Sequence, residues 1–303
     1  MSAAAPAKAI SGAAFATLLL IALMMGANHV AARIAFNHGV DVATAVVFRS
    51  TVTAGVIAAL LAVQGVRPRL SARQKRVLPG IGLLIGVQSL CLYSAVARLP
   101  VALALLAFNS YPIWTAMWSA VLYRQHPERA MLVAMPVILI GLAMALDVFG
   151  AASGLGASGQ WARIGAGVAF ALTASATFGL ALVLTQHEAG DVDGRVRTVV
   201  LMGVTGIVAL ATVAVQGGFH LPDAPAGWGG VAALTFLYGT AFTIMFTVLP
   251  RLGVVGNSAI MNVEPVFALV LAWLILGQSI APVQVAGALL VVGAVVMLGL
   301  RKR

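Results

Sequence analysis

Residues 258–267, Ser-Ala-Ile-Met-Asn-Val-Glu-Pro-Val-Phe, lie in the middle of an apolar run from about Val255 to Leu276. Of the eight acidic residues in the chain, Glu264 alone occupies the centre of such a run, directly before Pro265. An ionisable group at that depth is costly and marks a candidate functional site. The alternative is a helix break, in which Glu264 and Asn262 satisfy backbone groups that Pro265 frees.

The composition around this stretch is that of a membrane protein. The 303 residues are 61% hydrophobic and 9% charged, whereas a soluble domain carries roughly 25% charged residues. The net charge of +10 does not indicate nucleic acid, because the basic residues lie in short loops between apolar runs. The single cysteine, Cys91, excludes an internal disulfide, and we expect neither a metal nor a cofactor.

Ten apolar runs are long enough to cross a bilayer, which predicts an all-α polytopic membrane protein without a soluble domain. Lys8 and the run Ile10–Met25 resemble a signal peptide, but the run continues to Phe36, so we expect a retained first helix. The expected spans are Ser11–Ala35, Val42–Val63, Val77–Ala97, Val101–Leu122, Ala130–Val148, Ala162–Gln186, Val196–Val215, Trp228–Leu249, Val255–Leu276 and Val283–Leu300.

The distribution of lysine and arginine predicts the orientation. With the N-terminus in the cytoplasm, 14 of the 18 basic residues lie on the cytoplasmic side, against Arg33, Arg98 and Arg163 outside. This bias places both termini in the cytoplasm. Trp161, Trp228 and Trp273 then lie at outer ends of spans, where an aromatic belt is expected.

The chain contains a weak internal repeat. A shift of 153 residues aligns Asn109 with Asn262, Pro112 with Pro265 and Gln125 with Gln278, without a gap. Five spans per repeat is an odd number, so the halves, residues 1–150 and 151–303, must have opposite orientations. Inverted repeats are typical of secondary transporters, whose binding sites lie near the midplane between interrupted helices. We therefore expect helix breaks at Pro112 and Pro265.

In this arrangement the chain resembles the EamA-type branch of the drug/metabolite transporter superfamily. The resemblance rests on the five-plus-five repeat, on Met25-Gly26-Ala27-Asn28 and Arg49, and on Glu264-Pro265 before Leu271-Ala272-Trp273-Leu274-Ile275-Leu276-Gly277. It covers essentially the whole chain and implies export of amino acids, drugs or other metabolites through a cavity between the halves. The chain looks most similar to the bacterial YddG-type aromatic amino-acid exporters. It departs from the pattern at Met25, usually tryptophan, and at Gln278, often glutamate.

Polar and aromatic residues within the spans are the candidate cavity residues, and each has a structural alternative. Glu264 could bind a substrate ammonium or carry a proton; its repeat partner is Tyr111, so the site would be asymmetric. Arg49 could pair with a substrate carboxylate or with Glu264, or cap backbone carbonyls. His29 could carry protons or simply join helices. The remaining candidates either contact the substrate or pack between helices: Asn28, Asn109, Asn262, Tyr93, Tyr111, Trp114 and Tyr238.

The leading hypothesis is a secondary transporter in the inner membrane of a bacterium, exporting aromatic and other neutral amino acids by alternating access. A proton gradient could drive it, or it could be a uniporter; a monomer would suffice. A multidrug exporter of lipophilic cations is the alternative of the same fold, and a non-transporting scaffold is a more distant one. No phosphate-binding loop, H-E-x-x-H or G-x-S-x-G motif is present, so we expect no enzyme.

Overall fold

The computed structural model describes residues 12–66, 70–125, 129–247, 263–278 and 280–301, and all regular structure in these ranges is helical. Seven segments are long and apolar enough to cross a membrane, and three shorter apolar helices accompany them. The helices are α1 Gly12–Asn37, α2 Val42–Val63, α3 Ala72–Arg98, α4 Val101–Phe108, α5 Tyr111–Tyr123, α6 Arg129–Ala145, α7 Gly156–Glu188, α8 Gly194–Val215, α9 Pro225–Thr247, α10 Glu264–Leu276 and α11 Pro282–Arg301.

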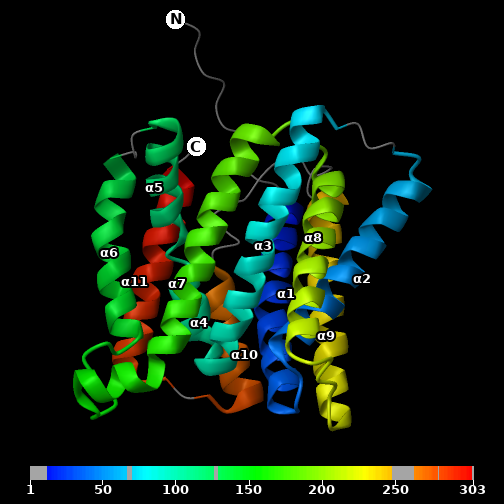
Figure 1. Cartoon of the computed structure of the whole chain (residues 1–303). Helices are drawn as coiled ribbons and strands as arrows, with labels where there is room; N and C mark the ends of the chain where they lie inside the picture. Colours follow the sequence, from blue (N-terminus) through cyan, green and yellow to red (C-terminus); the bar gives the residue numbers. More distant parts are fainter. Residues whose placement is uncertain (1–11, 67–69, 126–128, 248–262, 279, 302–303) are drawn as a thin grey trace, which may run out of the picture.

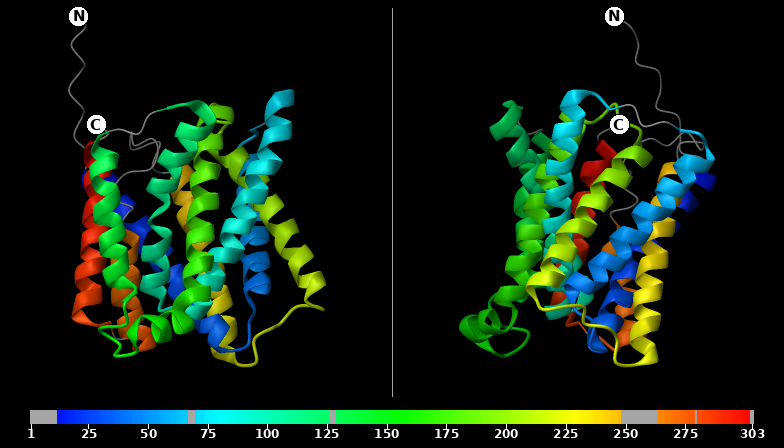
Figure 2. Two further views of the ribbon diagram at one scale, coloured as in Figure 1. Left: turned by 60° about the vertical axis from the view of Figure 1, so that its left-hand side comes forward. Right: turned by 45° about the vertical axis from the view of Figure 1, so that its right-hand side comes forward.

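The helices form one bundle in which α1 begins and α11 ends at the same end (Figure 1). Figure 2 shows α6 beside α11 at one edge and α2 beside α9 at the other. Between these edges α3 packs on α7, α1 on α9, and α2 on α8. Under the 153-residue shift α1 corresponds to α7 and α3 to α9, so the first two contacts are equivalent.

Local signals account for several helix ends. Ser71 and Gln74 form a capping box at the start of α3, as the sequence Ser-Ala-Arg-Gln favours. The Asp41 carboxylate accepts a hydrogen bond of 2.6 Å from the Thr44 amide at the start of α2. Arg33 donates to the carbonyls of Val96 and Leu99, at 2.5 and 3.3 Å, where α3 ends. The arginine therefore satisfies carbonyls that the helix leaves without an amide partner.

The expected span Val101–Leu122 consists of two helices, because α4 ends at Phe108 and α5 begins at Tyr111. Pro112 lies in the first turn of α5, where its missing N–H is not needed. Ser110 Oγ donates 2.7 Å to the Ala107 carbonyl, and Asn109 Nδ2 donates 2.8 Å to that of Leu105. The same two carbonyls also accept hydrogen bonds from the backbone amides of Asn109 and Ser110, so the end of α4 keeps its hydrogen bonds inside an apolar segment and the break is tolerated.

The second half contains a matching helix. α10 has 13 residues, as α5 does, and Pro265 lies in its first turn as Pro112 does in α5. Both helices end on a residue with left-handed backbone, Arg124 at φ 54° and Gly277 at φ 62°. In Figure 1, α5 occupies the upper part of the bundle and α10 the lower part. The two helices thus have one local design and lie at opposite ends.

Two glycines let these short helices approach a long neighbour. A Cβ added at Gly26 of α1 would lie 3.1 Å from the backbone nitrogen of Ala268 in α10. A Cβ added at Gly179 of α7 would lie 2.9 Å from that of Thr115 in α5. Gly26 and Gly179 differ by 153 positions, and so do Thr115 and Ala268. Both contacts therefore require a residue without a side chain.

The connection between α6 and α7 is closed by Asp147, whose φ is 50°. Its carboxylate accepts hydrogen bonds from the amides of Ala152 and Ser153, at 3.0 and 2.9 Å. Desolvation acts against the ionised form, but these hydrogen bonds outweigh it and lower the pKa of Asp147 below its ordinary value. The ionised carboxylate therefore stabilises this turn.

Candidate functional site

Glu264 is the first residue of α10, and its side chain faces α1. His29 Nε2 lies 3.4 Å from Glu264 Oε1; the histidine side chain is 3% exposed and the glutamate side chain 23%. A carboxylate placed among apolar helices needs such a partner, because an isolated charge is costly to desolvate. The pair joins two of the predicted candidates that lie 235 positions apart in the chain.

Tyr93 of α3 and Asn28 of α1 continue the polar cluster from this pair. Tyr93 is fully buried, and its hydroxyl donates 2.8 Å to Asn28 Oδ1. Its ring meets that of His29 edge-on, with ring centres 5.6 Å apart. The structure thus brings Asn28, His29, Tyr93 and Glu264 into one contiguous cluster. We call these residues, together with Arg49 of α2, the polar group.

Arg49 of α2 extends this group to α9. The side chain is 3% exposed, and its guanidinium carbon lies 4.7 Å from the Tyr93 ring centre and 4.1 Å from that of Tyr238. Arg49 Nη2 also donates 2.7 Å to Ser89 Oγ. Each ring contact of a desolvated cation contributes about 2 kcal/mol, which offsets part of the cost of burying the charge.

These partners decide between some of the three roles that the sequence analysis allowed for Arg49. The guanidinium caps no backbone carbonyl and has no carboxylate within 4 Å among the described residues. The expected alternative of a direct pair with Glu264 is therefore wrong, because His29 occupies that position beside the carboxylate. A substrate carboxylate remains the open alternative.

The equivalent position in the first half is aromatic and apolar. The Tyr111 ring lies 5.9 Å from that of Phe108 and 5.2 Å from that of Phe178, which belongs to α7. Trp114 is one turn further along α5, against Gly179. Tyr111 and Trp114 therefore pack between helices, and the Tyr111 phenol also lies within electrostatic range of the Glu264 carboxylate.

The two asparagines of the repeat cannot be compared. Asn109 is 7% exposed, and its amide nitrogen bonds a carbonyl of its own helix. It therefore neither joins two helices nor points to a ligand through that nitrogen. Asn262 lies outside the described residues.

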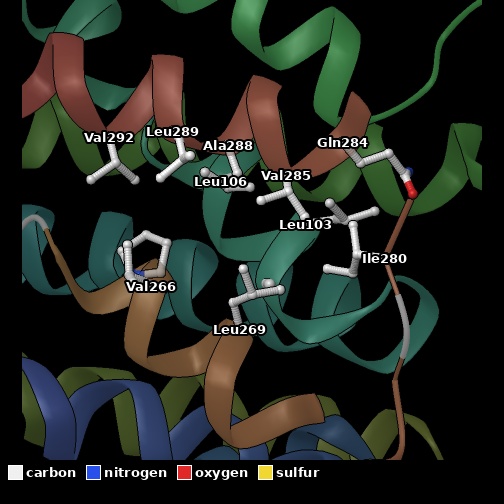
Figure 3. Close-up of a pocket in the computed structure, with 12 residues that line it drawn as sticks. Leu103, Leu106, Val266, Leu269, Ile280, Gln284, Val285, Ala288, Leu289 and Val292 are labelled. Atoms are coloured by element: carbon white, nitrogen blue, oxygen red, sulfur yellow. The ribbon is translucent and has the colours of Figure 1, made fainter. Parts of the chain in front are cut away.

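One pocket among the described residues is apolar and separate from the polar group. It lies between α4, α10 and α11, and Pro265 lines it while Glu264 does not (Figure 3). Its only polar side chain is Gln284, which donates 3.0 Å to the Ala145 carbonyl. A small apolar pocket of this kind has no groups that would hold a polar solute.

The sequence analysis missed Ser89, Phe178 and Met202, which contact the candidate residues. Ser89 lies beside Gln88 in the middle of an apolar span and one turn from Tyr93, so its polarity could have been noticed. Met202 accepts from the Tyr238 hydroxyl at 3.8 Å. Nothing in the sequence distinguishes Phe178 from other apolar residues of its helix, whereas the 153-residue shift aligns Met202 with Arg49.

Comparisons with known proteins address the whole chain. The family model described as "EamA-like transporter family" matches residues 12–146 and 165–300. No curated protein matches the chain. A solved structure titled "Crystal structure of protein" is similar over 96% of this chain and 99% of its own, with a TM-score of 0.63 and 19% identity. At that identity the likeness concerns the fold alone.

Proposed function

The chain belongs to the EamA-like transporter family, and on this premise we propose that it exports amino acids, aromatic and other neutral ones, or related small metabolites. The family is one of membrane transporters of small solutes, which sets the chain among transporters rather than enzymes. The export works as secondary transport by alternating access between two inverted halves of five spans. A monomer suffices, because one chain carries both halves.

The pair of Glu264 and His29 is the observation that carries this proposal. It places the only carboxylate at the centre of an expected span in the first turn of a short helix, beside a buried imidazole. Broken helices at the middle of a membrane are the usual ligand sites of transporters with inverted repeats. A carboxylate at such a site can bind the ammonium group of an amino acid or carry a proton.

The inverted arrangement has support in the contacts. The equivalence of α5 with α10, and of the Gly26 and Gly179 contacts, is what a pseudo-two-fold axis in the membrane plane would produce. The basic residues and the common end of α1 and α11 favour cytoplasmic termini in an inner membrane (Figure 1).

The test is a flux screen in proteoliposomes with phenylalanine, threonine, methionine and a lipophilic cation as cargoes. We expect the amino acids to move and Glu264→Gln to abolish their movement. If only the cation moved, the alternative of a multidrug exporter would replace the proposal. If nothing moved, a non-transporting scaffold would be favoured.

Proton coupling is tested separately in the same vesicles. With coupling through Glu264 or His29, an imposed pH gradient accelerates flux in the wild type. Flux that ignores the gradient and also survives Glu264→Gln would leave simple uniport as the mechanism.

A further inference from the structure

Arg49 is a buried cation that the polar group leaves without an anion. Its partners are two aromatic rings and the hydroxyls of Ser89 and Tyr93, which are neutral groups. Within the described residues no carboxylate lies within 4 Å of it, and the single acidic residue outside them, Glu128, belongs to a loop between expected spans. A guanidinium matches a carboxylate with two parallel hydrogen bonds.

Unpartnered donors gather around this cation. Arg49 Nε is buried without a hydrogen-bond partner, and so are the hydroxyls of Thr53, Thr205 and Thr235. Thr53 lies one turn from Arg49 on α2, and Thr235 one turn from Tyr238 on α9. Thr205 lies one turn from Met202 on α8, which packs on α2. Buried polar groups normally have partners, so four unpartnered donors, on α2 and on the two helices that pack on it, are open to a ligand that accepts hydrogen bonds.

The two ends of the polar group have opposite charge. Contacts run from Glu264 to His29, from His29 to Tyr93, and from Tyr93 to Arg49. Because two side chains separate the carboxylate from the guanidinium, the charges do not neutralise each other directly. The guanidinium end therefore lacks an anion of the kind that Glu264 supplies to His29 at the other end.

One of the two rings over Arg49 is held less firmly than the other. The Tyr93 hydroxyl bonds Asn28 at 2.8 Å, whereas the Tyr238 hydroxyl has only the Met202 sulfur, at 3.8 Å. Thioether sulfur is a weak acceptor. The Tyr238 hydroxyl is thus the more weakly bonded of the two.

We propose that Arg49 binds the carboxylate of the cargo, so that the site accepts zwitterionic α-amino acids in preference to the corresponding amines. This inference rests on the proposed function and specifies it, since Glu264 alone would accept any organic cation. Arg49 acts as a binding residue, with Thr53, Thr205 and Thr235 as further donors to the same anion.

The experiment compares two ligands that differ only in the carboxylate. Equilibrium binding of L-phenylalanine and 2-phenylethylamine is measured on the purified full chain in detergent, and L-methionine with 3-methylthiopropylamine provides a non-aromatic pair. The ratio of the two dissociation constants does not depend on the fraction of folded protein. We expect the wild type to favour each amino acid about tenfold or more, since a charged hydrogen-bonded pair is lost with the amine.

Arg49→Met is the decisive variant, because Met202 occupies the equivalent position of the second half. We expect its preference to fall to within about threefold of unity. Arg98→Met is the matched control, since Arg98 also lies over an aromatic ring, that of Phe170 at 4.7 Å, but near a helix end. The control should keep the wild-type ratio.

The outcomes separate the two proposals. A wild type that binds amine and amino acid equally, or an Arg49→Met variant that keeps the full preference, would overturn the role of Arg49 while leaving transport intact. Should Arg49→Met not fold, Arg49→Lys takes its place with a reduced preference expected, because a lysine lacks the planar fork. A wild type that neither binds nor moves any amino acid refutes the proposed function itself, and the inference with it.

Discussion

The junction of α1 with α10 and the junction of α7 with α5 have the same backbone and different chemistry. In each, a glycine of the long helix lies against the first turns of a 13-residue helix that has a proline in its first turn. The first junction pairs Glu264 with His29, whereas the second has Tyr111 and Leu182 at the equivalent positions. The difference teaches that the two breaks have one backbone architecture, and that function has to be sought where their side chains differ.

The ends of the same junctions show the opposite distribution of polarity. Where α5 and α7 end, Glu188 pairs with Arg73 at 2.5 Å and accepts a hydrogen bond from the Tyr123 hydroxyl at 3.0 Å. The equivalents of Glu188 and Tyr123 are Ala35 and Leu276, 153 positions away. The α1–α10 junction thus has its ion pair at the break, whereas the α5–α7 junction has its ion pair at the end.

The largest expected effect is on amino-acid flux, which should differ between variants at the two helix breaks. Glu264→Gln should lower amino-acid flux about thirtyfold or more, because a buried charge bonded to a ligand contributes about 2 kcal/mol or more. Tyr111→Phe removes one hydroxyl at the equivalent position and should change flux by less than about threefold. Flux in proteoliposomes, normalised to reconstituted protein, measures both. Equal losses in the two variants would mean that the breaks share one function.

The next effect tests the shared backbone. Gly26→Ala and Gly179→Ala should each destabilise the protein by about 1–3 kcal/mol through overpacking. Gly179→Ala should be the worse of the two, since its Cβ would lie 2.9 Å from backbone atoms that cannot rotate away, against 3.1 Å at Gly26. Thermal unfolding in detergent measures the difference. Gly203→Ala is the control, because a Cβ there has nothing within 4 Å.

A smaller effect concerns the turn between the halves, which sets one junction relative to the other. The pKa of Asp147 is lower in the folded protein than its ordinary value, so its ionisation stabilises the fold above that ordinary value. The contribution is lost as pH falls through the folded pKa. Asp147→Asn should therefore lower the melting temperature modestly at pH 7 and match the wild type in strong acid. A difference in melting temperature between the variant and the wild type that stayed constant with pH would contradict this account.

The smallest effect lies at the polar end of the α5–α7 junction. Arg73→Ala should cost only about 0.2–1 kcal/mol, because an exposed ion pair is weakened by water and salt. The Arg73 side chain is 73% exposed. The loss should shrink further at high salt, and Arg76→Ala, another exposed arginine of α3, gives the baseline. A loss that salt did not reduce would exclude an electrostatic origin.

The positions of the helices could be predicted from the sequence, whereas their rotation could not. Val42–Val63 agrees with α2 at both ends, since Asp41 and Gln64 bound an unbroken apolar run. The pairs of Glu264 with His29 and of Arg49 with Tyr238 join residues more than 180 positions apart. Spans that are apolar on every face give no periodic signal of which residue meets which neighbour. The inverted repeat and the ten-span count stay predictions.

Arg49 and Glu264 also have an electrical consequence. With both groups ionised, the polar group as a whole has no net charge, and a zwitterionic cargo adds none. Such a cargo crosses without work against the membrane potential, whereas a lipophilic cation gains or loses about 2.3 kcal/mol per 100 mV. Amino-acid uniport through this chain would therefore be electrically silent, and any current measured during export would count the protons that accompany each molecule.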